Sequence, residues 1–412
     1  MKKPIHSALI GETCDMTVLD SGLTVMLCEK PGKTAYAVFG TRYGSVNTVG
    51  GQDDPAGIAH FLEHKLFESE EGDAFTRFRE TGASANAYTS FDRTCYLFSA
   101  SSRFEENLAI LLDFVTHPYF SEKTVQKEQG IIGQEVKMYQ DNPSWCGFFG
   151  MLKSLYGDHP VTVPIAGTVE SIARITPELL YRHYAEEYTL SNMFVCIAGN
   201  FSKEAVMRQL QPLSQEKKPH KATVQVARPA LNPVREISRL PIQIPEVHLG
   251  WHDGSLTRIP TAHETAVRQV TAEALFGDCS SLKHTLIKEG LANDSFEADY
   301  LFGPNYRVFA VSTEAADPDR VIRRVREGLT QICKRGVDGN EVRRAARRLY
   351  GASVCSYTTA EDTAGELVEA AVNGFEPFSL CEEYLSVTPE EVAAVLDAFQ
   401  SAPAESVVLP LA

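Results

Sequence analysis

The stretch Gly57-Ile-Ala-His-Phe-Leu-Glu-His-Lys-Leu-Phe67 carries an H-x-x-E-H array made of His60, Glu63 and His64. Apolar residues recur around the array at helical spacing, so the sequence predicts a helix here. On a helix, two histidines four residues apart project from one face, which suits two nitrogen ligands on a single Zn²⁺. Glu63 lies on that face but is misaligned for a third ligand, which leaves it free to act as a base toward a water on the metal. The stretch therefore predicts a zinc-dependent peptidase, with the groups of H-E-x-x-H in inverted order.

The array alone is only moderately specific. With eleven histidines in 412 residues, an accidental H-x-x-E-H is expected roughly a few times in a hundred such chains. The rest of the sequence must therefore decide between a metal site and chance.

Composition excludes several classes of protein. The chain has 412 residues, 43% of them apolar, which is enough for two or three domains with their own cores. The net charge of −15 argues against nucleic acid as a partner and is compatible with cationic peptides. Nine widely spaced cysteines without a C-x-x-C predict reduced thiols in a cytoplasmic protein. The sequence shows no signal peptide and no apolar run of membrane-spanning length, so we expect no membrane association.

Strand-like and helical patterns alternate along the first half. Asp20-Ser-Gly22 is a hairpin signal between two β-rich runs, and residues 36–43 form a further strand candidate. Residues 104–115 carry leucines at helical spacing and predict an amphipathic core helix. A long helix is expected over residues 121–139, ended by Asp141-Asn-Pro143. This half thus predicts an antiparallel sheet with helices.

The second half repeats a similar order of elements after a polar, proline-punctuated segment, which indicates a degenerate internal duplication. We therefore predict an α+β fold of two homologous domains, each a mostly antiparallel sheet packed with helices, in a clam-shell arrangement. The expected divisions are an N-terminal zinc-binding catalytic domain at 1–212, a linker at 213–234 and a C-terminal domain without zinc at 235–412. The H-x-x-E-H array occurs only in the first half.

A catalytic zinc needs a third protein ligand. Glu128 and Glu135 lie seven residues apart, two turns along one face of the expected long helix. One carboxylate could reach the metal while the other hydrogen-bonds a ligand. The alternative is that both belong to a solvated, charged helix face.

Five segments follow one another along the chain: His60-Phe-Leu-Glu-His64, Ala85-Asn-Ala-Tyr-Thr89, Glu128-Gln-Gly-Ile-Ile-Gly-Gln-Glu135, Ile165-Ala-Gly167 and Ser191-Asn-Met193. This is the order expected of the pitrilysin/insulysin family, and the chain resembles its short two-domain branch, which includes the mitochondrial processing peptidase and bacterial zinc proteases. The resemblance implies that His60, His64 and Glu135 bind zinc and that Glu63 is the general base. It also implies that Glu128 does not bind the metal itself and instead hydrogen-bonds a metal ligand.

The resemblance also implies where peptides bind. Substrates of this family add a strand to the edge of the first sheet, which here is expected at residues 85–89, with Asn86 and Ala87 as contacts made largely through their backbone. The alternative for this segment is a plain structural strand.

The second half departs from the family pattern. Active members usually supply an arginine and a tyrosine that stabilise the oxyanion, but Leu286 and Asn293 stand at those positions, and neither can do that work. The missing pair implies a heterodimer with a paralogous subunit that carries it; a second copy of this chain is the other candidate partner. Alternatively, Tyr306 and Arg307 compensate from a neighbouring strand.

The sequence therefore predicts a cytoplasmic zinc metalloendopeptidase that hydrolyses peptides or leader segments, with this chain as the zinc-bearing subunit of a heterodimer. The competing hypothesis is a catalytically silent scaffold or peptide-binding subunit of the same family. The intact set of His60, Glu63, His64 and Glu135 favours the enzyme, because a scaffold has no physical need for all four.

Overall fold

The structure is a computed structural model that describes residues 4–32, 34–47, 54–70, 72–215, 220, 231, 233–254, 258–303 and 305–411. The chain divides into two compact units, each described here by itself. The first unit comprises residues 1–136, 164–224 and 354–378, and the second comprises residues 137–163, 225–353 and 379–412. Each unit thus includes a segment from the other half of the sequence, which the expected divisions at 212 and 235 did not foresee. Most of the predicted linker, 213–234, lies outside the described residues.

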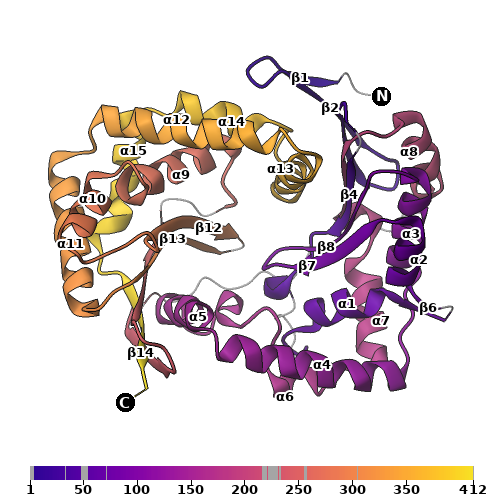
Figure 1. The fold of residues 1–412 in the computed structure, drawn as a ribbon, viewed down its shortest axis with the longest axis horizontal. Coiled ribbons are helices and arrows are strands. Elements are labelled where there is room, and N and C mark those ends of the chain that lie inside the picture. Colours follow the sequence, from indigo (N-terminus) through magenta and orange to yellow (C-terminus); the bar gives the residue numbers. More distant parts are fainter. Residues whose placement is uncertain are drawn as a thin grey trace. The chain divides into compact units, whose positions relative to one another are not determined.

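Within the described residues, the first unit has a seven-stranded sheet in the order β1-β2-β3-β9-β4-β8-β7 (Figure 1). Its strands are β1 (Ile5–Ser7), β2 (Glu12–Val18), β3 (Thr24–Glu29), β4 (Ala35–Thr41), β7 (Ser84–Thr89), β8 (Thr94–Ala100) and β9 (Met193–Gly199). Neighbours pair antiparallel except β3 and β9, which are parallel. The predicted hairpin is β2 and β3. β9 is buried along its whole length, as its apolar run requires, and β7 lies at one edge.

Helices cover this sheet, and a two-stranded ribbon of β5 (Glu68–Ser69) and β6 (Gly72–Asp73) follows the first of them. The helices are α1 (Ile58–Leu66), α2 (Ala74–Thr81), α3 (Phe104–Thr116), α4 (Glu122–Gln140), α6 (Val169–Ile172), α7 (Pro177–Glu187), α8 (Lys203–Leu210) and α13 (Ala360–Asn373). The amphipathic helix expected at 104–115 is α3, with its leucines buried. The long helix expected at 121–139 is α4, whose last residues belong to the second unit.

Helix α13 completes the core of the first unit although its residues come from the second half of the sequence. It packs on the sheet against β9, β4 and β3. Arg42, just after β4, donates from Nε and Nη2 to the carbonyl oxygen of Ala371 at 3.0 and 2.8 Å. Arg93 forms an ion pair of 2.5 Å with Glu369. The charged contacts therefore fix the last turn of α13 to the sheet.

The second unit is built on a five-stranded sheet, counted over the described residues, in the order β10-β14-β11-β13-β12. Its strands are β10 (Arg235–Leu240), β11 (Glu246–His252), β12 (Glu297–Gly303), β13 (Tyr306–Glu314) and β14 (Ala404–Pro410). Only β10 and β14 pair in parallel among these strands. The helices are α5 (Pro143–Tyr156), α9 (Ala262–Phe276), α10 (Ser281–Lys288), α11 (Pro318–Arg335), α12 (Gly339–Ser356), α14 (Ser379–Glu383) and α15 (Pro389–Val395).

The two faces of this sheet are covered differently. Val247, Leu249 and Trp251 of β11 point into a core shared with α9 and α11. Alternate residues of a strand point to opposite faces, so His248 and Gly250 face the other way, where α5 packs close to them. The sequence prediction had no helix at 143–156, because Asn142 and Pro143 were taken only as the end of α4. They are also the N-cap and first residue of α5.

The predicted α+β fold with two sheet-and-helix units is confirmed. No disulfide joins the nine cysteines, all of which are in the described part of the chain. Over the same part, no helix has both the length and the apolar character that crossing a membrane requires.

Candidate metal centre

Two glycines set the position of α1. Gly57, its N-cap, has a φ of +90°, and a Cβ there would lie 2.5 Å from the carbonyl oxygen of Ala166. Gly167 has a φ of +74° and approaches the backbone of Ala56 equally closely. Only glycine tolerates this combination of backbone conformation and crowding. The Ile165-Ala-Gly167 segment therefore acts structurally, by fixing where α1 begins.

Helix α1 holds the H-x-x-E-H array against the edge of the sheet. Ile58, Phe61, Leu62 and Leu66 are fully buried, as the predicted apolar face requires. The helix packs on β7 and β8, and Figure 1 shows α4 along its other side. The two histidines of the array contact α4 through Glu128 and Glu135.

The structure brings His60, His64 and Glu135 together. Glu135 places one carboxylate oxygen 3.6 Å from His60 Nε2 and the other 3.6 Å from His64 Nε2. One ligand atom from each of the three lies within 4.8 Å of the others, and this is the one such group of metal-ligating side chains found among the described residues. All three belong to the first unit.

Glu128 orients one of the histidines. Its Oε1 lies 2.9 Å from His64 Nδ1, so we assign the proton to Nδ1, with the lone pair of Nε2 turned toward Glu135. Burial by itself would lower the pKa of His64, but the hydrogen bond to Glu128 and the carboxylates of Glu63 and Glu135 raise it above its ordinary value. Burial would raise the pKa of Glu128, but the hydrogen bond with His64, together with the positive charges of His64, Lys65 and Lys127, outweighs burial and lowers that pKa. The two glutamates of α4 thus have different positions, one facing both histidines and one behind His64.

Glu63 is not one of the three clustered donors, although its charge acts on His64. Its Oε2 accepts a hydrogen bond of 2.7 Å from the Thr89 hydroxyl on β7. Thr89 closes the predicted edge strand, but the sequence reasoning gave it no role. A buried carboxylate anchored at one oxygen keeps its second oxygen for proton transfer, which is the requirement for a general base.

The donor set fits zinc. Two imidazole nitrogens and one carboxylate oxygen leave a fourth tetrahedral position open, as in catalytic zinc sites. Donors about 2.1 Å from a tetrahedral metal lie roughly 3.4 Å from one another, and the observed histidine to glutamate separations are 3.6 Å. The two histidine-to-glutamate separations are therefore close to the spacing that the metal needs, and all three donors lie within 4.8 Å of one another.

The predicted peptide-contacting residues lie on the edge strand β7. Asn86 is exposed and Ala87 is half-buried. The Asn86 side-chain oxygen accepts a hydrogen bond of 2.9 Å from the Ala87 amide. A peptide strand that used this amide would have to displace the Asn86 side chain.

The second unit offers no oxyanion donor at the expected positions. Leu286 is fully buried in the core beneath α10. The Asn293 side chain accepts from the Ser295 amide at 2.8 Å and donates to Glu314 at 3.1 Å, so it stabilises its own turn.

The alternative donors, Tyr306 and Arg307, are also engaged within the second unit. Both are buried. The Tyr306 ring packs against Tyr156 and His159, and the Arg307 guanidinium donates to the carbonyl oxygen of Arg258. Their burial argues against the proposed compensation.

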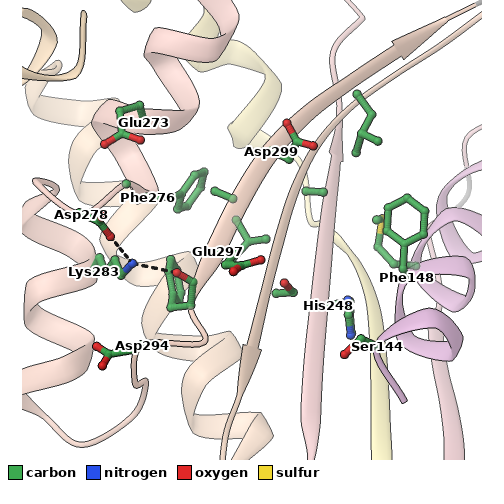
Figure 2. Close-up of a pocket in the computed structure, with 18 of the residues that line it drawn as sticks. Ser144, Phe148, His248, Glu273, Phe276, Asp278, Lys283, Asp294, Glu297 and Asp299 are labelled. Carbon is green, nitrogen blue, oxygen red and sulfur yellow. Dashed lines mark hydrogen bonds and ion pairs between the residues drawn. The ribbon is translucent and has the colours of Figure 1, made fainter. Parts of the chain in front are cut away.

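A cavity of about 660 Å³ lies in the second unit, beside β12 and β13. Figure 2 shows Glu297 and Asp299 along β12, with His248 and Ser144 on another wall. Lys283 in this cavity is satisfied by Asp278 at 2.7 Å and the carbonyl oxygen of Phe296 at 2.9 Å. Among the described residues that line this cavity, no three metal-ligating side chains lie close enough together to share an ion, so the candidate centre remains the cluster in the first unit.

Comparisons with known proteins cover both halves of the chain. Residues 28–169 match the family described as insulinase (peptidase family M16), and residues 174–349 match the family described as peptidase M16 inactive domain. The chain is 35% identical to YmfH of Bacillus subtilis, an uncharacterised zinc protease, over 96% of each protein. It is 26% identical to the uncharacterised zinc protease SCO5738 of Streptomyces coelicolor, over 97% of this chain and 90% of that protein.

Solved structures show the same architecture. An M16-like peptidase from Alicyclobacillus acidocaldarius is 31% identical and superposes with a TM-score of 0.89, over 97% of this chain and 99% of the other. A protease from Helicobacter pylori, 17% identical, shares the fold with a TM-score of 0.83 over 97% of this chain and 100% of that one.

Proposed function

The chain belongs to the insulinase family of peptidases, peptidase family M16, and we propose that it is the zinc-bearing subunit of a metalloendopeptidase. The observation that carries this proposal is the convergence of His60, His64 and Glu135 beside Glu63. A partly buried set of two imidazoles and two carboxylates costs free energy to assemble, and binding a cation offsets that cost.

The roles of the residues follow from their positions. His60, His64 and Glu135 would hold the metal, and Glu128 would keep the His64 ring in the required orientation. When bound, zinc supplies Lewis-acid polarisation of a water and of the peptide carbonyl. Glu63 would accept a proton from the attacking water and return it to the leaving amine.

The substrate we propose is an extended peptide or leader segment paired with β7. That strand lies at the edge of its sheet, and its last residue contacts Glu63, so a peptide there would present its backbone beside the reacting groups. Asn86 and Ala87 are the expected contacts.

We also propose a cytoplasmic location, because nine cysteines without a disulfide in the described residues suit a reducing compartment.

We propose that a paralogous subunit completes the oxyanion site. Leu286 and Asn293 cannot supply the donors, and burial keeps Tyr306 and Arg307 from doing so. The same observation supports the second candidate function, a catalytically silent peptide-binding subunit. The clustered donors favour the enzyme, since peptide binding alone does not require them.

Metal analysis combined with an activity assay separates these two functions. The chain would be purified from its native host with whatever subunit accompanies it, and its metal content measured before and after treatment with 1,10-phenanthroline. We expect one zinc per chain and hydrolysis of quenched fluorogenic peptides that is lost with the metal and restored by zinc. A preparation that holds no zinc after zinc is supplied would support the scaffold and overturn the enzyme.

A further inference from the structure

Thr89 makes a contact that none of the assigned roles uses. It is the last residue of the edge strand β7 and pairs in register with Thr94 of β8. Its hydroxyl oxygen lies 2.7 Å from Glu63 Oε2, on a residue 26 positions earlier in the chain. The strand that would bind the peptide therefore also contacts the proposed base.

The direction of this hydrogen bond follows from counting protons. Thr94 donates its single hydroxyl proton to the carbonyl oxygen of Tyr43 at 2.9 Å. The two threonine hydroxyls are 3.5 Å apart, too long for a strong bond between them. An ionised carboxylate has no proton to give, so Thr89 is the donor and Glu63 the acceptor.

From this contact we infer that Thr89 is a positioning residue for Glu63. The hydroxyl holds Oε2 and so fixes the plane of the carboxylate, which leaves Oε1 for the attacking water. A carboxylate released from this bond can rotate about its terminal torsion, which is soft, and small misplacements of a catalytic group cost large factors in rate. The inference rests on the proposed function, because only a catalytic Glu63 needs this alignment.

Substitutions at Thr89 test the inference in the zinc-loaded chain with its partner subunit. Thr89→Val keeps the size and β-branching but removes the donor, whereas Thr89→Ser keeps the donor. We expect Thr89→Val to lower kcat by about 10- to 100-fold, with KM and zinc content unchanged, and Thr89→Ser to recover most of the rate. Thr94→Val is the matched control; it removes a hydroxyl from the paired strand without touching Glu63 and should affect kcat little.

A Thr89→Val protein with the wild-type kcat would overturn the inference. Loss of zinc, or a rise in KM with kcat unchanged, would also overturn it, since either assigns Thr89 to metal retention or peptide binding. Failure of Thr89→Ser to recover the rate would show that the hydroxyl is not the relevant group.

A second measurement does not depend on activity. Thermal unfolding midpoints of the full chain are compared for wild type, Thr89→Val, Glu63→Ala and the double variant. We expect the sum of the midpoint shifts of the two single variants to exceed the shift of the double variant, because each single substitution removes the same hydrogen bond. Additive shifts would show that Thr89 and Glu63 are not coupled, which would contradict the hydrogen bond between them. If the wild-type complex cleaves no peptide, the proposed function fails, and this cycle still decides whether Thr89 holds Glu63.

Discussion

At the scale of single residues, Glu128 is the most informative neighbour of the metal centre, because its contact with His64 Nδ1 at 2.9 Å selects which nitrogen faces Glu135. We predict that Glu128→Ala weakens zinc affinity about 10- to 100-fold, measured by competition with a chromogenic chelator. Glu128→Gln should weaken it less, since the amide oxygen still accepts the bond. Glu122→Ala, at the exposed start of the same helix, is the control. Equal affinity in Glu128→Ala and wild type would contradict the orienting role.

Sequence patterns specified some of these residues and not others. The spacing of His60 and His64 was sufficient to predict a shared helical face. Spacing could not decide which of Glu128 and Glu135 is the third metal ligand, because both lie on one face of α4. Only the position of α1 distinguishes the two carboxylates. Thr89 was missed because its partner is 26 residues away and no local pattern marks the contact.

At the scale of elements, the attachment of α13 through Arg42 is open to test. Both guanidinium bonds end on Ala371 in the last turn, where a cation is favoured by the helix dipole and by unsatisfied carbonyls. We predict that Arg42→Met lowers the free energy of unfolding by about 2 kcal/mol, measured by denaturant titration. Arg77→Met, which removes an exposed pair with Asp113, should cost under about 1 kcal/mol. Equal effects of the two substitutions would contradict the attachment.

A second prediction about the elements concerns His263 on α9. Its side chain links α9 to both α14 and α15. Its ring nitrogens lie 2.7 Å from Glu391 and 2.7 Å from Glu383, and the bonds to Glu391 and then Glu383 raise the pKa of His263. A raised folded pKa gives a stabilisation that is complete below the unfolded value of about 6.5 and is lost as pH rises through the folded pKa.

We therefore predict that His263→Gln destabilises the protein more at pH 6 than at pH 9. The side chain is 35% exposed, so solvent limits the difference to about 1 kcal/mol or less. Thermal melts at the two pH values measure it, with His284→Gln, an exposed histidine on α10, as control. A loss of stability of equal size at both pH values would contradict an ion pair between protonated His263 and the two glutamates.

Elements were predictable where their periodicity was strong. Helices α3 and α4 follow from apolar spacing, and the pairing of β2 with β3 follows from the turn between them. The sequence prediction did not place α13, whose alanines, glycine and acidic residues give a weak apolar signal. Its position on the first sheet was also beyond prediction, because periodicity identifies an apolar face but not the sheet that covers it.

At the scale of the whole molecule, the missing oxyanion donors predict dependence on a partner. Removing one such donor from an enzyme costs about 10²- to 10³-fold in kcat, so we predict at least that gain when the paralogous subunit is added to the isolated chain. The measurement is kcat/KM on one fluorogenic peptide, with and without the partner. Substituting the partner's arginine or tyrosine should abolish the gain. Robust cleavage by a verified pure monomer or homodimer would contradict the requirement.

The central claim is that His60, His64 and Glu135 hold a zinc ion on which Glu63 acts as the base. Its most direct test is zinc content and peptide hydrolysis measured together on wild type and Glu63→Gln, each with its partner subunit. We predict one zinc per chain in both proteins, with hydrolysis in the wild type and none detectable in Glu63→Gln. Retained turnover in a zinc-loaded Glu63→Gln protein would contradict the claim.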